Sequence, residues 1–185
     1  MPSDTIIKAA ENLLRNTKNI TIAIDGRCAS GKTTLAEKIS QAVDCNVIHT
    51  DDFFLPHEQK TTERLSQAGG NIDYERLYNE IILPLKEKTS FSYRAYNCSS
   101  GKLSEYIYVK PKPITIIEGT YSLHPHFKEY ADLKVFMDVS ESEQKQRLKI
   151  RNIRLYERFI NEWIPMEEHY FNEFAIRKKC DLIFK

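Results

Sequence analysis

Short apolar runs alternate along the chain with longer amphipathic stretches. The runs at 20–24 and 114–117 are rich in β-branched residues and carry no charge, and a further apolar run covers 133–139. Such runs are typical of strands that are buried on both faces of a parallel sheet. Shorter apolar segments at 47–50 and 182–184 predict two more strands.

Between these runs, apolar side chains recur at intervals of three and four residues, the spacing of one helix face. The predicted helices cover about 3–14, 32–43, 74–85 and 163–175, and Pro84 is expected to disturb the third of them. Alternation of short strands with helices predicts an α/β fold, a mostly parallel sheet with helices on both faces.

A β-hairpin extension is predicted at about 91–109. Residues 91–96 and 103–109 have the composition of strands, and Ser-Ser-Gly-Lys at 99–102 has the composition of a turn. The chain has 185 residues and no flexible linker or repeat, so we expect one domain over residues 1–185.

Charge and composition exclude several classes of function. The chain has 27 Lys and Arg against 26 Asp and Glu, and a balanced charge does not favour coating of nucleic acid or of anionic membranes. Apolar runs of four or five residues are too short to span a membrane, and the N-terminus lacks the pattern of a signal peptide. The four cysteines have no metal-binding spacing. We therefore expect a cytoplasmic protein with neither a membrane nor a nucleic-acid partner.

Residues 26–33 match the Walker A pattern G-x-x-x-x-G-K-[ST] of a phosphate-binding loop, between a predicted strand and a predicted helix. Lys32 is expected to reach the β- and γ-phosphates of ATP, and the Thr33 hydroxyl to hold Mg²⁺. The predicted cofactor-binding residues are Gly26, Arg27, Cys28, Ala29, Ser30, Gly31, Lys32, Thr33 and Thr34.

Carboxylates stand at the ends of two predicted strands, the edge at which α/β sheets bind ligands. Asp51 and Asp52 follow 47–50, and Glu118 follows 114–117. A kinase needs one acid beside the acceptor hydroxyl and another near Mg²⁺, and we assign Glu118 to the metal. A single acid at the end of a strand commonly does no more than cap a turn. Acids at the ends of two strands, beside a Walker A loop, favour a functional role. The GTPase motifs NKxD and DxxG are absent.

A lid region is predicted at about 144–160, within a charged helix over 141–160. Its arginines recur at three- and four-residue spacing, which places them on one face where ATP phosphates can meet them. They are Arg147, Arg151, Arg154 and Arg158. A solvated helix face is the plainer interpretation, and nucleic-acid binding is a weaker one.

Together, the motifs resemble those of the phosphoribulokinase/uridine kinase family, from about residue 20 to 184. The matching segments are Ile24–Thr34, Thr50–Phe54, Ile117–Gly119 and Arg147–Asn152. The resemblance implies a P-loop NTPase three-layer sandwich, with a five-stranded mostly parallel sheet and a hairpin over the acceptor site. It also implies roles: Asp51 as the acid that accepts the hydroxyl proton, with Lys32, Arg147 and Arg151 acting on the phosphates.

The acceptor site resembles the family less closely. Asp73 resembles an acid that holds sugar hydroxyls, although it also reads as a helix N-cap. The hairpin has no histidine, and its Tyr93, Arg94 and Tyr96 either bind the acceptor or pack across strands.

From these residues we expect an ATP- and Mg²⁺-dependent kinase that phosphorylates a hydroxyl of a nucleoside such as uridine or cytidine. A kinase for pantothenate, a phosphosugar or a nucleotide is one alternative, and a non-catalytic ATP-binding regulator is another. A homo-oligomer remains possible.

Overall fold

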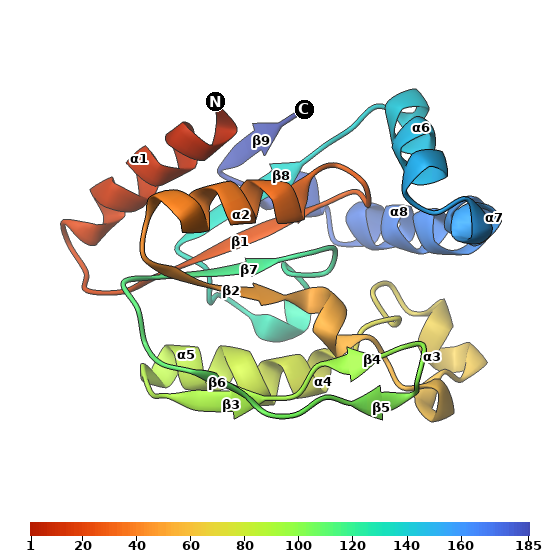
Figure 1. Ribbon diagram of the computed structural model, residues 1–185, viewed down its shortest axis with the longest axis horizontal. Helices are drawn as coiled ribbons and strands as arrows, with labels where there is room; N and C mark the ends of the chain where they lie inside the picture. The colour runs from red at the N-terminus through yellow and green to blue at the C-terminus, as the bar shows by residue number, and fades with distance from the viewer.

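The computed structural model describes residues 1–185, and its centre is a five-stranded sheet in which all strands are parallel (Figure 1). The strand order is β2-β7-β1-β8-β9. The strands are β1 (Ile20–Gly26), β2 (Cys45–His49), β7 (Ile114–Glu118), β8 (Leu133–Met137) and β9 (Leu182–Phe184). In register, Ile22 of β1 lies between Ile116 and Leu133. The predicted α/β fold is confirmed.

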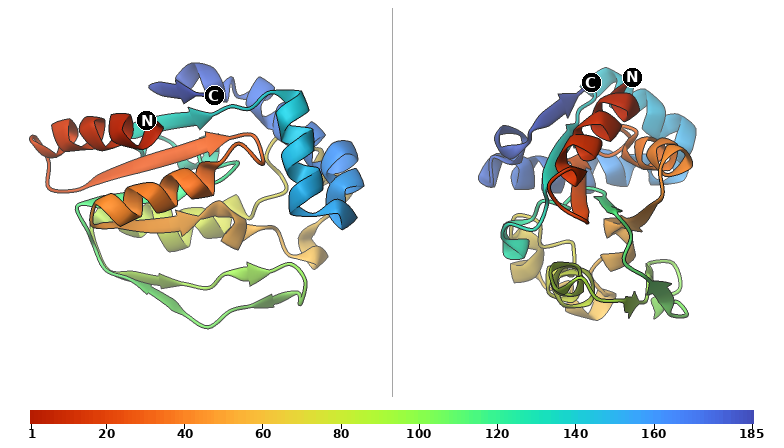
Figure 2. Two further views of the ribbon diagram at one scale, coloured as in Figure 1. Left: turned by 45° about the horizontal axis from the view of Figure 1, so that its top comes forward. Right: turned by 90° about the vertical axis from the view of Figure 1, so that its left-hand side faces the viewer.

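Helices α1 (Pro2–Leu14) and α2 (Lys32–Ala42) cover one face of the sheet (Figure 2). Successive strand residues point to opposite faces, so alternate residues of β1 face these helices. Ile22 and Ile24 are fully buried in this layer with Ile6 of α1 and Ile39 of α2. The expected helical spacing of apolar residues therefore produces the first of two cores.

The second core lies on the opposite face, beneath one long helix and the C-terminal helix α8 (Ile164–Glu173). The long helix runs through α4 (Tyr74–Leu77), the π-helical segment η3 (Tyr78–Ile82) and α5 (Leu83–Glu87). Pro84 stands in the first turn of α5. Because proline cannot donate to the preceding turn, the expected disturbance takes the form of a wide π turn directly before it, and the helix continues.

The predicted hairpin is present as two short antiparallel ladders. β3 (Phe91–Tyr93) pairs with β6 (Ile107–Val109), and β4 (Tyr96–Asn97) pairs with β5 (Lys102–Leu103). Tyr93 and Val109 join the second core, which fixes the hairpin against the long helix.

The single helix predicted over 141–160 is wrong. Helix α6 (Glu141–Arg151) ends at Asn152, whose backbone is extended and whose side chain caps η5 (Ile153–Leu155). Arg147 and Arg151 lie on α6, whereas Arg154 and Arg158 lie beyond the break, so the four arginines do not share one helix face. A new helix then runs through α7 (Tyr156–Arg158) and η6 (Phe159–Trp163) into α8 without a gap.

The remaining segments are short. They are α3 (Thr62–Ser66), η1 (Thr50–Phe53), η2 (His57–Gln59), η4 (Pro125–Phe127) and η7 (Ile176–Lys179). None of the helices is both long enough and apolar enough to cross a membrane.

Candidate functional site

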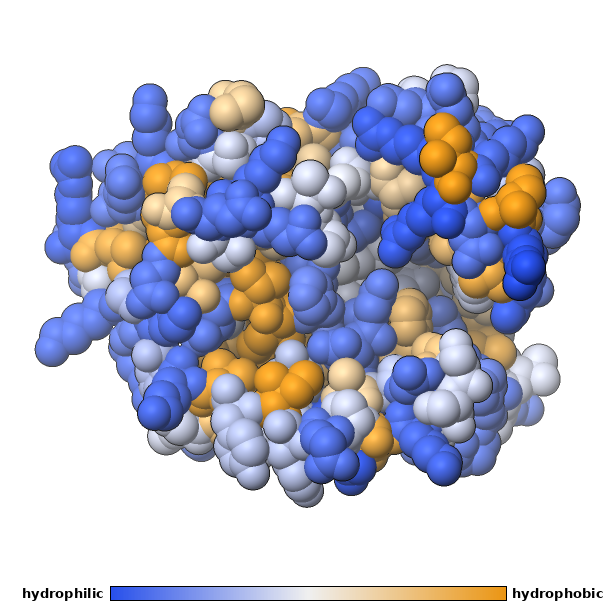
Figure 3. All heavy atoms as spheres, in the orientation of Figure 1, coloured by the Kyte–Doolittle hydropathy of each residue, from blue (hydrophilic) through white to orange (hydrophobic).

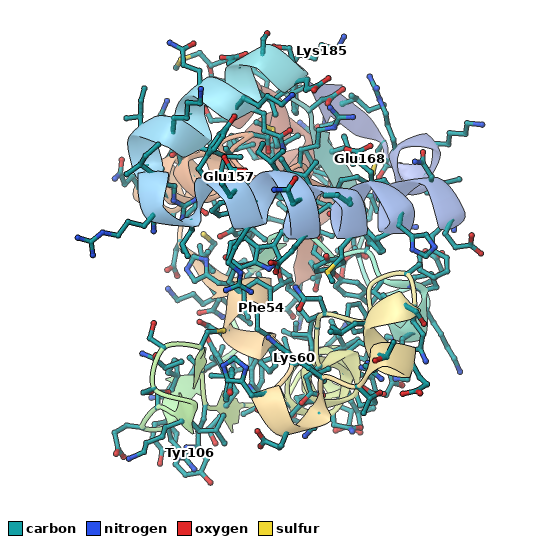
Figure 4. All side chains as sticks on the ribbon, turned by 90° about the vertical axis from the view of Figure 1, so that its right-hand side faces the viewer. Phe54, Lys60, Tyr106, Glu157, Glu168 and Lys185 are labelled. Carbon is teal, nitrogen blue, oxygen red and sulfur yellow. The ribbon has the colours of Figure 1, made fainter.

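The predicted site residues gather where the strands of the sheet end, at the right-hand side of Figure 1. The surface is hollowed there, between α6 above and the β4–β5 ladder below, and its rim is mostly hydrophilic (Figure 3). Figure 4 looks onto this edge, with the helix from Glu157 to Glu168 above and Phe54 and Lys60 below.

The loop between β1 and α2 has the backbone of an anion-binding loop. Gly31 has a φ of 94° and ends the loop, so the N–H groups that open α2 have no partners within the helix. These N–H groups belong to Lys32, Thr33 and Thr34, and together with the helix dipole they suit a phosphate. Gly26 has a φ of 135°, and a Cβ there would stand 2.0 Å from the carbonyl oxygen of Met137. The loop therefore requires glycine at its first position and fits the phosphates of ATP.

The Lys32 ammonium lies folded inside this loop. Its Nζ donates to the carbonyl oxygens of Gly26 (2.7 Å) and Arg27 (2.8 Å) and lies 3.4 Å from the Thr120 hydroxyl. Lys32 is buried but pairs with no carboxylate. Its positive charge is therefore available to an anion that enters the loop.

Glu118 and Thr33 meet beside the loop, as a magnesium site requires. The Thr33 hydroxyl donates to Glu118 Oε1 over 3.0 Å, and Glu118 is buried at the end of β7. A hydroxyl and a carboxylate are the hard oxygen ligands that Mg²⁺ prefers, with waters completing the shell. No group of three or more His, Cys, Asp or Glu side chains is arranged to hold a metal ion.

His49, which sequence reasoning missed, also contacts Glu118. Its Nδ1 lies 2.5 Å from Glu118 Oε1, and this hydrogen bond raises the pKa of His49. The signal in the sequence is weak: His49 pairs in register with Glu118 on the neighbouring strand, which only the strand order reveals.

Asp51 and Asp52 are adjacent in η1 but differ in their partners. The surrounding protein raises the pKa of both carboxyls. Asp52 Oδ2 accepts a hydrogen bond from the Tyr93 hydroxyl over 3.3 Å, whereas the Asp51 carboxylate has no hydrogen-bond partner. The Asp51 side chain is exposed, and the charges of Lys32 and Arg151 act to lower its pKa against the desolvation that raises it.

Asp73 caps the long helix, which confirms its interpretation as a helix N-cap. Its Oδ1 accepts from the N–H of Arg76 over 3.0 Å. The Arg76 guanidinium lies over the Phe53 ring and donates to the carbonyl oxygens of Asp52 and Arg94. It thereby ties η1 to the hairpin. An open hollow of about 640 Å³ adjoins Asp73 and Arg76.

The hairpin candidates make mostly structural contacts. Tyr93 is buried and stacks on Phe53 with ring centroids 5.4 Å apart. Arg94 donates across the hairpin to the carbonyl oxygens of Ser104 and Leu103. The Tyr96 hydroxyl accepts from the His57 N–H over 3.3 Å.

The start of α6 is already docked on the phosphate loop. Arg147 Nη1 donates to the carbonyl oxygen of Ala29 over 2.9 Å, and Gln144 Nε2 donates to that of Cys28 over 3.0 Å. Arg151 lies at the end of α6, and its charge acts to lower the pKa of Asp51. Arg158 instead pairs with Glu162 over 3.0 Å on its own helix.

Two acids of α8, which sequence reasoning also missed, hold the other side of the loop. Glu167 Oε2 accepts from the Cys28 N–H over 2.9 Å, and Glu168 pairs with Arg27 over 2.9 Å. A signal for Glu167 was present, because it lies three and four residues before the core residues Tyr170 and Phe171 and therefore shares their buried face.

Comparisons with known proteins agree with this geometry. The model of the phosphoribulokinase/uridine kinase family matches residues 21–154. A uridine kinase of Mycoplasma pneumoniae is 27% identical over 192 residues, which cover 90% of this chain and 84% of that protein. A uridine kinase of Borrelia duttonii is 29% identical over 142 residues, covering 74% of this chain and 66% of that protein. The uridine-cytidine kinase C of Dictyostelium discoideum is 24% identical over 135 residues, only 29% of its length.

Solved structures share the fold. A possible uridine kinase from Bacillus stearothermophilus superimposes with a TM-score of 0.72 at 21% identity, covering 98% of both chains. A D-glycerate 3-kinase from Cryptococcus neoformans reaches a TM-score of 0.62 at 14% identity, over 90% of this chain and 86% of that one. These likenesses establish the fold that the chain shares with these structures. By sequence, by fold and by the loop at its centre, the chain belongs to the phosphoribulokinase/uridine kinase family.

Proposed function

We propose that this protein is an ATP-dependent kinase that transfers the γ-phosphate to a hydroxyl of a small metabolite, and that the metabolite is a nucleoside. The observation that carries the proposal is Asp51. Its exposed carboxylate has no hydrogen-bond partner, and the charges of Lys32 on the loop and Arg151 on α6 both act to lower its pKa. An exposed carboxylate that has no partner and is influenced by both cations is free to accept a hydrogen bond from the acceptor hydroxyl.

The roles of the chain's own residues follow from their positions. The loop amides and Lys32 hold the β- and γ-phosphates, and Arg151 and Arg147 approach from α6. Asp51 orients the acceptor hydroxyl and accepts its proton as the new bond forms; a free Asp has a pKa of about 3.9, so this base is weak and acts late. Thr33 and Glu118 would hold Mg²⁺, which when bound would neutralise charge on the phosphate oxygens.

The arrangement favours Asp51 over Asp52 as the base. Asp52 already accepts from Tyr93, and its own main-chain carbonyl accepts from Arg76, so it has a structural role between η1 and the hairpin. The nucleoside is supported by the names of the relatives, which cover most of this chain.

A turnover screen with a matched pair of variants tests the proposal. MgATP consumption is measured against uridine, cytidine, other nucleosides, pantothenate and phosphosugars, with analysis of the phosphorylated product. Asp51→Asn is expected to lower kcat by about 10²- to 10⁴-fold while MgATP still binds. Asp52→Asn, the neighbouring control, is expected to retain most of the activity. Inactivity of Asp52→Asn with an active Asp51→Asn would assign the base to the other acid.

Two further variants separate the phosphate contacts from a general loss of charge. Lys32→Ala is expected to abolish turnover. Arg151→Ala is expected to lower kcat by at least about 10-fold, because it removes a cation beside the transferred group. Arg154→Ala, an exposed neighbour beyond the helix break, is the control and should have little effect. Equal kinetics for the two arginine variants would assign Arg151 to the solvated surface, and lack of turnover with every acceptor would favour the regulator.

A further inference from the structure

The mechanism proposed above does not use Glu167, a buried acid that contacts the phosphate loop. Glu167 of α8 is 6% exposed and projects toward the inner side of the phosphate loop. Its Oε2 accepts from the Cys28 N–H over 2.9 Å, and its Oε1 lies 3.3 Å from the Thr120 hydroxyl oxygen. A buried carboxylate that has one N–H donor and one shared hydroxyl is costly unless it serves the site.

Thr120 links Glu167 to Lys32. Its hydroxyl oxygen lies 3.0 Å from the Gly26 carbonyl oxygen, 3.3 Å from Glu167 and 3.4 Å from Lys32 Nζ. A hydroxyl has one hydrogen to donate, so it can serve either Gly26 or Glu167 but not both. If it serves Gly26, Glu167 needs a proton of its own to bond with Thr120. The network therefore has two arrangements, which differ by one proton on Glu167.

The charged and titratable groups around Glu167 come from three elements. Lys32 approaches from the loop and α2, the Cys28 thiol from the loop, and the Tyr121 phenol from the segment after β7. Beside it on α8, Glu168 is paired with Arg27. Burial raises the pKa of Glu167 to about 7, and Lys32 is the strongest influence in the opposite direction.

We propose that Glu167 is a positioning residue that holds the phosphate loop and Lys32 through Cys28 and Thr120, and that it takes up a proton when a nucleotide polyphosphate binds. The inference rests on one part of the proposed function, the binding of a nucleotide, and does not depend on which acceptor is phosphorylated. A polyphosphate attracts Lys32 away from Thr120 and brings its own negative charge near the carboxylate. Both changes favour the protonated arrangement, in which Thr120 serves Gly26 and the loop keeps its shape.

The test is the number of protons exchanged when MgATP binds. Binding is followed by titration calorimetry at pH 7 in two buffers of different ionisation enthalpy. With Glu167 about half ionised in the free protein, we expect wild type to take up about half a proton more than Glu167→Gln. Glu173→Gln removes an exposed acid from the same helix and should match wild type. Equal uptake in wild type and Glu167→Gln would overturn the proposal.

The pH profile supplies a readout that a merely structural residue would not change. Because binding raises proton affinity, the MgATP affinity of wild type should fall between pH 6 and 8 more steeply than that of Glu167→Gln. The two profiles should differ in slope by up to about half a log unit per pH unit at pH 7. Parallel profiles would contradict the coupling, whatever the absolute affinities.

A measurement on wild type alone decides the matter if Glu167→Gln does not fold. With ¹³C-labelled glutamate side chains, one carboxyl resonance should titrate near neutrality, well above the usual glutamate pKa of about 4.3, and move to its protonated position on MgATP addition. Absence of such a resonance would overturn the inference. Proton uptake without turnover for any acceptor would refute the kinase and leave this inference standing; turnover without uptake would do the reverse.

Discussion

Removal of one hydroxyl at the base of the phosphate loop should destabilise the protein by a predictable amount. Asp25, at the end of β1, is fully buried and accepts four hydrogen bonds. Three come from the N–H groups of Gly26 (2.7 Å), Leu123 (3.0 Å) and Tyr121 (3.3 Å), and the fourth from the Tyr170 hydroxyl over 2.7 Å. Tyr170→Phe deletes the fourth bond and leaves the aromatic packing in place.

A hydrogen bond to an ionised group contributes about 1.5–3 kcal/mol, so Tyr170→Phe should lower the free energy of unfolding by that amount where Asp25 is ionised. Tyr130→Phe is the matched control, because its hydroxyl donates to the neutral carbonyl of Ser122. That bond should contribute only about 0.5–1.5 kcal/mol. Urea denaturation measures both losses, and an unchanged slope with a shifted midpoint shows that the denatured state is unaffected.

The pH dependence of the stability loss in Tyr170→Phe shows whether the hydroxyl favours the ionised or the protonated form of Asp25. Burial raises the pKa of Asp25, and the Tyr170 hydroxyl is the strongest of the groups that lower it. The hydroxyl therefore favours the ionised carboxylate, and the loss in Tyr170→Phe should be largest above the folded-state pKa of Asp25 and smaller as pH falls through it. A loss that stays no greater than that of Tyr130→Phe, or one that grows as pH falls, would refute this reasoning.

Three other substitutions test the local structure. Gly119→Ala should cost about 1–3 kcal/mol, since the residue has a φ of 133° and a Cβ would stand 1.9 Å from the Thr50 hydroxyl; an unchanged thermal midpoint would contradict this. Ser140→Ala should lower the free energy of unfolding measured in urea by about 1 kcal/mol, because the Ser140 side chain accepts from the Glu143 N–H at the start of α6. A smaller effect of Ser140→Ala than of the exposed control Ser142→Ala would exclude Ser140 as the cap. In metal-free protein the stability deficit of His49→Gln should be greater at pH 6 than at pH 9. The raised pKa of His49 means that its contribution is complete below the unfolded-state pKa and is lost as pH rises through the folded-state pKa; a deficit that grows with pH would show that His49 pairs with Glu118 as a neutral ring.

The sequence was most informative about groups whose chemistry depends on residues that are close to them along the chain. The loop at 26–33 is a local motif whose glycines and following helix create the anion site wherever it occurs. The acids after β2 and β7 could be placed together because the carboxyl ends of parallel strands share one edge. In contrast, the hydrogen bond from Tyr93 to Asp52, which supports the proposal of Asp51 as the base, joins residues 41 positions apart.

The lid shows why a periodic pattern can mislead. Four arginines at helical spacing predicted one charged face, but spacing alone cannot show where a helix ends. Asn152 ends α6 and caps the next segment, so the last two arginines lie beyond the helix that carries the first two. The hydrogen bonds that end the helix are formed by neighbouring residues. Which arginines reach the site, however, depends on where α6 packs against the rest of the protein.

By itself, the sequence determined the α/β alternation, the parallel sheet and the phosphate loop, because each follows from hydrophobic periodicity or from a contiguous motif. Only the tertiary structure decided how that loop is held. Glu167 and Gln144 contact Cys28 from more than a hundred residues away, and His49 reaches Glu118 across two neighbouring strands. The physical reason is that burial and hydrogen bonding are properties of a place in the fold. An acid in a charged helix looks the same in sequence whether it faces water or a phosphate loop, but only the buried one can couple its proton to the ligand.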